Sequence, residues 1–139
     1  MKISVKTEYA CLAMLSLAAA DARGEPVRIR EIAEQHQISA RFLVQILLQL
    51  KNAGLAASTR GASGGYQLAR PAREITLLEV MDAAEPAEDE STRGTSSRWL
   101  PTLRECWRQA AARERAELAQ INLVELLAKA REQNAMYYI

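Results

Sequence analysis

Residues 55–71, LAASTRGASGGYQLARP, form two short strand-like segments, 55–59 and 66–69, joined by a glycine-rich tip. Glycine adopts positive φ and lets the backbone approach another group closely, as a tight hairpin tip requires. Directly before this stretch, residues 39–53 repeat apolar side chains at helical spacing. A helix followed at once by a basic, glycine-tipped hairpin predicts a winged helix, a shape that grips duplex DNA.

Two helical patterns separated by a short turn precede the hairpin. Residues 28–35 form the first, and residues 39–53 form the second, which has an apolar stripe on one side and polar side chains on the other. Ser39 stands where an N-cap belongs, with a hydroxyl able to accept a free backbone N–H, and Gly54 stands where the helix ends. This pair predicts a helix-turn-helix. Residues 9–20 predict a further helix, buried because it is apolar nearly all round.

The second helix of the motif carries side chains suited to reading bases. Its first turns hold Ser39, Ala40, Arg41 and Gln45. Arginine can bond guanine, glutamine can bond adenine, and a small side chain can lie beside a thymine methyl. Arg60 stands where the first strand ends, suited to the negative potential of a minor groove. The residues expected to face DNA are Arg28, Ser39, Ala40, Arg41, Gln45, Thr59, Arg60, Gly61, Ser63 and Gly64. The alternative is that the helical residues are ordinary solvent-facing side chains of a helical hairpin.

The glycine-rich tip also matches two enzyme motifs by its letters. Residues 61–65 fit G-x-S-x-G, but a nucleophile elbow needs a following helix and a later histidine. Here a strand follows, and the single histidine, His36, comes earlier. A phosphate-binding loop is excluded because no Lys-Ser/Thr pair follows the glycines. No paired carboxylates, metal-ligand set or nucleophile–base pair stands out elsewhere, so we expect no enzyme.

Charge is unevenly distributed along the 139 residues. Residues 1–73 hold ten Lys and Arg against five Asp and Glu, whereas residues 74–139 hold eight against twelve. The halves therefore carry formal charges of +5 and −4, although the net charge is only +1. A basic half predicts contact with a polyanion, with a chance split in a neutral protein as the alternative. The hydrophobic content of 49% is enough for a packed core.

The second half of the chain predicts an oligomerisation segment. Apolar side chains recur at helical spacing through residues 99–120, and too little chain remains to cover them. A second copy of the helix is the expected partner, and packing back on its own domain is the alternative. The residues expected at this dimer contact are Leu103, Trp107, Ala110, Ala111, Glu114 and Leu118.

The sequence therefore predicts a mainly α fold with a small antiparallel β-hairpin, in three parts. These are a winged helix-turn-helix DNA-binding domain at residues 1–84, a flexible loop at 85–98, and a dimerisation helix with a C-terminal helical segment at 99–139. Two cysteines imply no disulfide framework, and the first residues have no signal-peptide layout. We expect a reduced, cytoplasmic protein without membrane contact.

Several motifs carry a family resemblance. They are residues 1–9 (MKISVKTEY), residues 29–38 (IREIAEQHQI), and the series Arg60-Gly61, Gly64-Gly65-Tyr66, Arg70-Pro71. With them the chain resembles the Rrf-type ("Rrf two") family of bacterial transcription regulators, well over residues 1–84 and more loosely over 107–127. The resemblance implies a winged-helix homodimer that binds a palindromic operator in double-stranded DNA, usually as a repressor. It also implies that positions matching Arg41, Gln45 and Arg60 face DNA.

The chain departs from the family's cluster-binding members in one respect. Those members carry three cysteines in the loop before the dimer helix, whereas residues 85–105 contain none. Because iron–sulfur clusters need several thiolates, we expect no bound cluster and no metal site. The alternative is a redox- or cluster-dependent sensor that uses Cys106 and Glu8, the latter at a position from which some members supply a carboxylate. The favoured interpretation of Cys106 is a buried thiol acting as a small apolar side chain.

Two further points stay open from the sequence. A protein-interaction module could have kept this fold, lost DNA binding and act through its acidic half. A regulator also needs a signal, and the sequence does not identify the small-molecule or redox effector.

Overall fold

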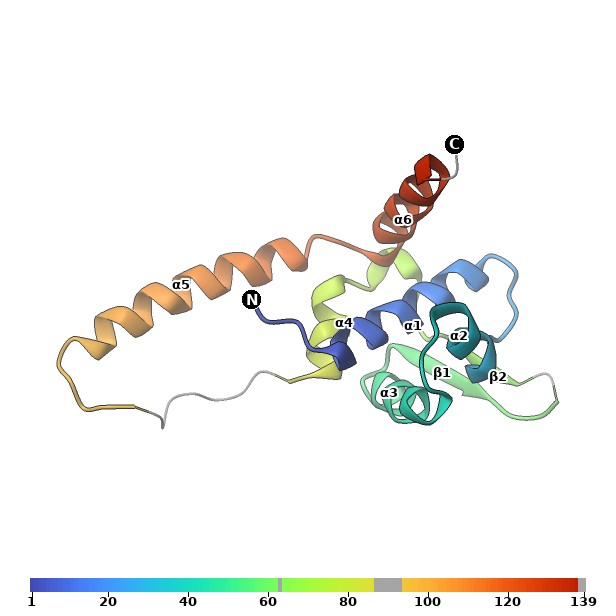
Figure 1. The fold of residues 1–139 in the computed structure, drawn as a ribbon, viewed down its shortest axis with the longest axis horizontal. Coiled ribbons are helices and arrows are strands. Elements are labelled where there is room, and N and C mark those ends of the chain that lie inside the picture. The colour runs from blue at the N-terminus through green and yellow to red at the C-terminus, as the bar shows by residue number, and fades with distance from the viewer. Residues whose placement is uncertain (63, 87–93, 138–139) are drawn as a thin grey trace.

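The computed structural model describes residues 1–62, 64–86 and 94–137 (Figure 1). Helix α1 (Val5–Asp21) lies at the centre of the core, and helices α2, α3, α4 and α6 and strand β2 all pack against it. Its Ala10, Ala13 and Met14 are fully buried. Alanine suits this position because a small side chain lets neighbouring helices approach closely on several sides. Ser4 caps the start by accepting a hydrogen bond from the Thr7 N–H at 3.1 Å, so the helix begins earlier than predicted.

Helices α2 (Ile29–His36) and α3 (Ala40–Asn52) form the helix-turn-helix. The turn is made by Gln37 in the left-handed region, with φ of 57°, and by Ile38, which is buried. Ser39 is the N-cap of α3, but its side chain makes no capping hydrogen bond, which corrects the prediction. Its ψ is 127°, whereas Ser4 and Thr76, whose side chains do cap their helices, have ψ of 159° and 157°. The Ser39 hydroxyl is therefore aimed differently and remains exposed.

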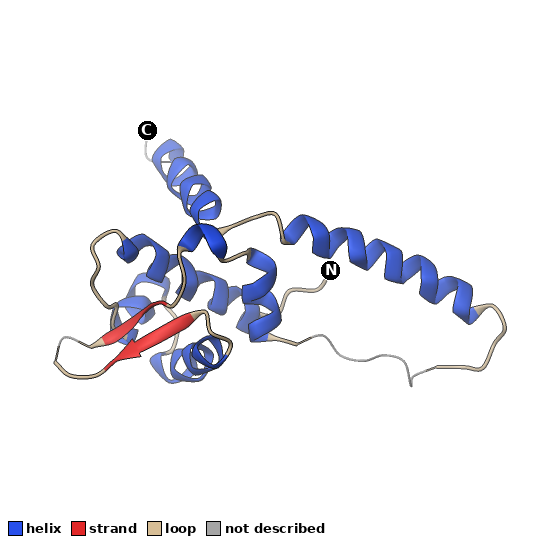
Figure 2. Ribbon diagram, turned by 180° about the vertical axis from the view of Figure 1, so that it is seen from behind, coloured by secondary structure: helices blue, strands red, loops and turns tan. Residues whose placement is uncertain are grey.

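Strands β1 (Ala56–Thr59) and β2 (Gly65–Leu68) form an antiparallel hairpin, drawn in red in Figure 2. The register pairs Ala56 with Leu68 and Thr59 with Gly65. Gly54, with φ of 79°, ends the preceding helix and turns the chain into the first strand. The predicted fold class, mainly α with one small antiparallel hairpin, is confirmed.

A short 3-10 helix, η1 (Ala72–Glu74), leads from the hairpin into α4 (Leu77–Ala84). A capping box starts this helix: the Thr76 side chain accepts from the Glu79 N–H, and the Glu79 side chain accepts from the Thr76 N–H. Glu79 also receives a hydrogen bond from Arg70 Nη1 at 2.5 Å. One carboxylate therefore starts α4 and joins it to the chain that leaves the hairpin.

Helices α5 (Leu100–Leu118) and α6 (Leu123–Tyr137) complete the chain. Helix α5 projects away from the body, whereas the start of α6 lies against it (Figure 1). Arg115 holds the inner end of α5 on α4 by two hydrogen bonds to the carboxylate of Asp82, at 3.0 and 2.8 Å. Part of the predicted flexible loop, residues 87–93, lies outside the described residues. No helix in the described part of the chain is both long and apolar enough to cross a membrane.

The double role of Glu79 gives a test by pH. The hydrogen bond from Arg70 is the main reason that the pKa of Glu79 lies below its ordinary value of 4.5. A lowered folded-state pKa contributes stability that is present above about pH 4.5 and lost as the pH falls through the folded-state value. We expect Glu79→Gln to lower the free energy of unfolding by about 1 kcal/mol or less at pH 7, since the pair is partly exposed.

Urea titrations from pH 7 to pH 3 check this expectation. The difference between Glu79→Gln and the unmodified protein should shrink as the pH falls below about 4.5. Glu125→Gln is the matched control, because Glu125 occupies the same position relative to Asn122 at the start of α6 and makes no ion pair with the described residues. An equal, pH-independent effect of both substitutions would contradict the assigned role of Glu79.

Candidate nucleic-acid interface

Helix α3 and the hairpin lie side by side on the face of the body opposite α6 (Figures 1 and 2). Their relative position is fixed by the core and by one surface contact. On the inner side of α3, Leu43, Ile46 and Leu47 are buried. At its end, Lys51 Nζ donates a hydrogen bond to Ser58 Oγ of β1 at 2.7 Å. One continuous surface therefore carries both elements that the sequence predicted to meet DNA.

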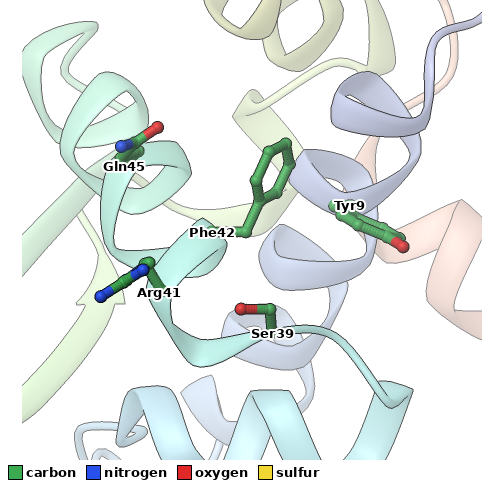
Figure 3. A pocket seen from close by; sticks show the side chains of 5 residues that line it. All are labelled: Tyr9, Ser39, Arg41, Phe42 and Gln45. Carbon is green, nitrogen blue, oxygen red and sulfur yellow. The ribbon is translucent and has the colours of Figure 1, made fainter.

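The first turns of α3 border a shallow hollow of about 300 Å³. It is lined by Tyr9, Ser39, Arg41, Phe42 and Gln45. Figure 3 shows Arg41 and Gln45 on one side of α3, and Phe42 directed toward α1. The rings of Tyr9 and Phe42 meet edge to face, with centroids 5.7 Å apart, an arrangement that holds the start of α3 against α1. The structure thus brings together three of the predicted DNA-facing residues, Ser39, Arg41 and Gln45, all exposed.

Two exposed apolar residues on α3 were missed by the sequence reasoning. Val44 is 48% exposed and Leu48 is 51% exposed, although both belong to an apolar-rich helix. At 100° per residue, Leu48 lies about 20° to one side of Arg41 and Gln45 about 40° to the other, so all three share the outward side. Val44 and Leu48 are four residues apart and lie outside the buried side of the helix, and this spacing in the sequence could have indicated that they are exposed. Apolar side chains at such positions can contact thymine methyls.

The tip of the hairpin presents Arg60 to solvent. Its side chain is exposed and makes no hydrogen bond or ion pair with the described residues. Gly61 follows with φ of 107°, a conformation that L side chains rarely adopt. Gly64 is buried, and a Cβ there would overlap the Thr59 carbonyl oxygen, so Gly64 shapes the tip from within. Ser63, also predicted to face DNA, lies outside the described residues.

Three other predicted DNA-facing residues take different positions. Arg28 stands before α2, and its guanidinium donates a hydrogen bond to the Ala62 carbonyl at the hairpin tip. Ala40 is the exposed first residue of α3. Thr59 is exposed at the end of β1, opposite Gly65. The predicted set therefore divides between the start of α3 and the hairpin tip.

The turn that aims α3 is held by a buried serine of α1. Ser16 Oγ lies 2.7 Å from His36 Nε2, and Ser16 is 7% exposed. Partial burial lowers the pKa of His36 below its ordinary value of 6.5, which favours the neutral ring at pH 7. His36 therefore supports the turn as a hydrogen-bonding group.

The predicted dimer residues lie along one exposed side of α5. Leu103 is 49% exposed and Trp107 is 60% exposed; Ala110 and Ala111 are exposed too. Glu114 and Leu118 are half-buried near the body. At that end an apolar groove of about 490 Å³ lies between α1, α4 and α5. The groove is lined by Met1, Ile3, Thr7, Glu8, Cys11, Leu12, Leu15, Leu77, Met81 and Leu118.

The two cysteines lie in different environments. Burial raises the pKa of the Cys11 thiol to about 11, so it is not a thiolate at neutral pH. Cys106 is exposed on α5, so the expectation of a buried thiol was wrong for this chain. One chain supplies two cysteines, fewer than the four thiolates of the common clusters. Across residues 1–62, 64–86 and 94–137, no group of three or more His, Cys, Asp or Glu is placed to hold a metal ion.

Together, a helical core, a helix-turn-helix and a following hairpin define a winged helix-turn-helix protein. The family model described as "Iron-dependent Transcriptional regulator" matches residues 3–129. The chain belongs to this family, the Rrf2 family of transcriptional regulators.

Relatives and solved structures agree with this assignment. The chain is 43% identical over 86 residues to the HTH-type transcriptional regulator IscR of Cereibacter sphaeroides, covering 61% of this chain and 56% of that protein. It is 33% identical over 133 residues to a putative HTH-type regulator, ORF2, of Azotobacter vinelandii, covering 93% and 80%. The structure of CymR, the global cysteine regulator of B. subtilis, has a TM-score of 0.80 at 29% identity, covering 93% of this chain and 98% of that one. IscR of T. potens has a TM-score of 0.78 at 31% identity, covering 99% and 97%. These proteins are transcription regulators, not enzymes.

Proposed function

We propose that this chain is a sequence-specific DNA-binding transcription regulator that acts as a homodimer on a palindromic operator, as a repressor and without an iron–sulfur cluster. The observation that carries the proposal is the shared surface of α3 and the hairpin. It presents Arg41 and Gln45 from the first element and Arg60 from the second, all exposed. The regulator family supplies the class of activity.

The geometry suits contact with two grooves. The start of α3 would enter the major groove, where Arg41 and Gln45 can hydrogen-bond base edges. The hairpin, extending beyond α3, would place Arg60 in the adjacent minor groove. Exposed Arg and Lys side chains on this surface would neutralise phosphates, so affinity should fall steeply with salt.

A second copy is the partner that best explains α5. This helix has no buried residue and leaves Leu103 and Trp107 exposed, and at its inner end Leu118 lines an apolar groove at the body. Apolar surface of this kind marks an interaction site. A two-fold dimer repeats the same contacts in both directions and presents two α3 helices, which is why we propose a palindromic operator.

The repressor role and the absence of a cluster rest on different support. Members of the family that the sequence resembles usually repress. The chain's own donors, one thiol of raised pKa and one exposed thiol, argue against a cluster. We therefore place any signal outside cluster chemistry.

Selection from a random-sequence DNA pool tests the proposed function. The purified protein should enrich duplexes that contain two inverted half-sites centred about one helical turn apart. A variant with Arg41→Ala and Gln45→Ala is the control and should enrich no common sequence. Failure of the unmodified protein to enrich any sequence at low salt would refute sequence-specific binding and favour a protein-interaction module.

The contribution of the hairpin is tested by Arg60→Ala. We expect it to weaken binding to the selected duplex about ten-fold or more, because a charged side chain is lost from the minor groove. Arg73→Ala is the matched control, since Arg73 is an exposed arginine on η1, which packs on α6 at the opposite face. Gel-shift titrations measure both. Equal affinity of Arg60→Ala and the unmodified protein would count against the wing.

The dimer contact is tested by adding a charge to α5. Trp107→Glu should shift the protein from dimer to monomer in sedimentation equilibrium, because it would bury an unpaired carboxylate in the contact. Ala112→Glu adds the same charge on the opposite side of α5 and should stay dimeric. Circular dichroism confirms that both variants fold. A dimer that persists in Trp107→Glu would place the interface elsewhere.

A further inference from the structure

Near its tip, strand β2 of the hairpin is joined to the chain that enters α2. Val27 N–H donates to the Tyr66 carbonyl, and Tyr66 N–H donates to the Val27 carbonyl, both at 2.8 Å. A Cβ on Gly65 would overlap the Val27 carbonyl oxygen, so the two backbones touch. The start of α2 is therefore a fixed support directly beside the second strand.

The hairpin tip beyond this pairing makes few hydrogen bonds among the residues that the structure describes. Arg60, Gly61 and Ala62 are exposed, and Gly61 adopts positive φ. Within the tip, Gly64 N–H donates to the Gly61 carbonyl at 3.0 Å. The Arg28 guanidinium, one residue after Val27, bonds the Ala62 carbonyl. Among the side chains that the structure describes, Arg28 alone hydrogen-bonds the backbone of this tip from outside the hairpin.

We propose that Arg28 is a positioning residue that fixes the wing tip and thereby aims Arg60, and does not itself contact DNA. The inference rests on the proposed function and replaces the sequence-based expectation that Arg28 faces DNA. Ordering a glycine-containing loop costs conformational entropy. Because Arg28 orders the tip in the free protein, the entropy cost of ordering is included in folding. DNA binding then does not include this cost, and the affinity for DNA is higher.

A phosphate contact by Arg28 is the rival explanation, and the free protein separates the two. Arg28→Met keeps an unbranched apolar side chain similar to the stem of arginine and removes both charge and donors. Arg28→Lys keeps a donor and the charge. Arg30→Met removes the same charge from the neighbouring exposed arginine, which makes no hydrogen bond to the tip. Amide hydrogen exchange of Gly61, Ala62 and Gly64, measured without DNA, reports the order of the tip.

We expect exchange at the Gly64 amide to rise several-fold in Arg28→Met, to rise less in Arg28→Lys and to be unchanged in Arg30→Met. Unchanged exchange in Arg28→Met would overturn the proposal. Because the exchange measurement needs no DNA, its outcome is independent of the proposed function. The proposed function fails separately, if the unmodified protein does not bind the selected duplex.

A double-mutant cycle on the selected duplex then tests whether Arg28 acts through Arg60. We expect Arg28→Met alone to weaken binding several-fold, and to add less than two-fold in a protein that already carries Arg60→Ala. If the full loss persists in the Arg60→Ala background, Arg28 makes its own DNA contact and the positioning role is refuted.

Discussion

The structure depends on the pair of backbone hydrogen bonds between Val27 and Tyr66. Each bond contributes about 1 kcal/mol net, but its main effect is geometric. The two bonds pair the chain before α2 with strand β2, on which β1 also pairs. The orientation of the wing is therefore coupled to that of the helix-turn-helix. Glycine at position 65 is required because any side chain would separate the two backbones. The recognition helix and the wing can therefore act as one surface.

Much of this surface was predictable because its signals are local. Glycines at 54 and 61 mark a helix end and a hairpin tip, both with positive φ in the structure. Thr76 and Glu79, three residues apart, form a capping box whose spacing is likewise visible in the sequence. These features depend on spacing over three or four residues, which a single sequence displays.

The remaining features depend on partners that are distant in the sequence. Arg28 and Ala62 are 34 positions apart, so nothing near Arg28 indicated that its guanidinium would bond the wing tip. Gly64 was expected on the surface, but the fold of the tip buries it. Cys106 was expected to be buried, but α5 projects from the body and leaves it exposed. Placing these residues needs the arrangement of whole elements, which propensity and periodicity do not supply.

The proposed function requires that α3 and the wing of each subunit contact DNA together. Hydroxyl-radical footprinting on the selected duplex tests it most directly, because cleavage reports protection of the sugar at every position. We predict a two-fold symmetric pattern, in which each half-site shows backbone protection flanking one major-groove segment and a separate protected minor-groove tract beside it. A single unbroken tract, or protection without two-fold symmetry, would contradict the account.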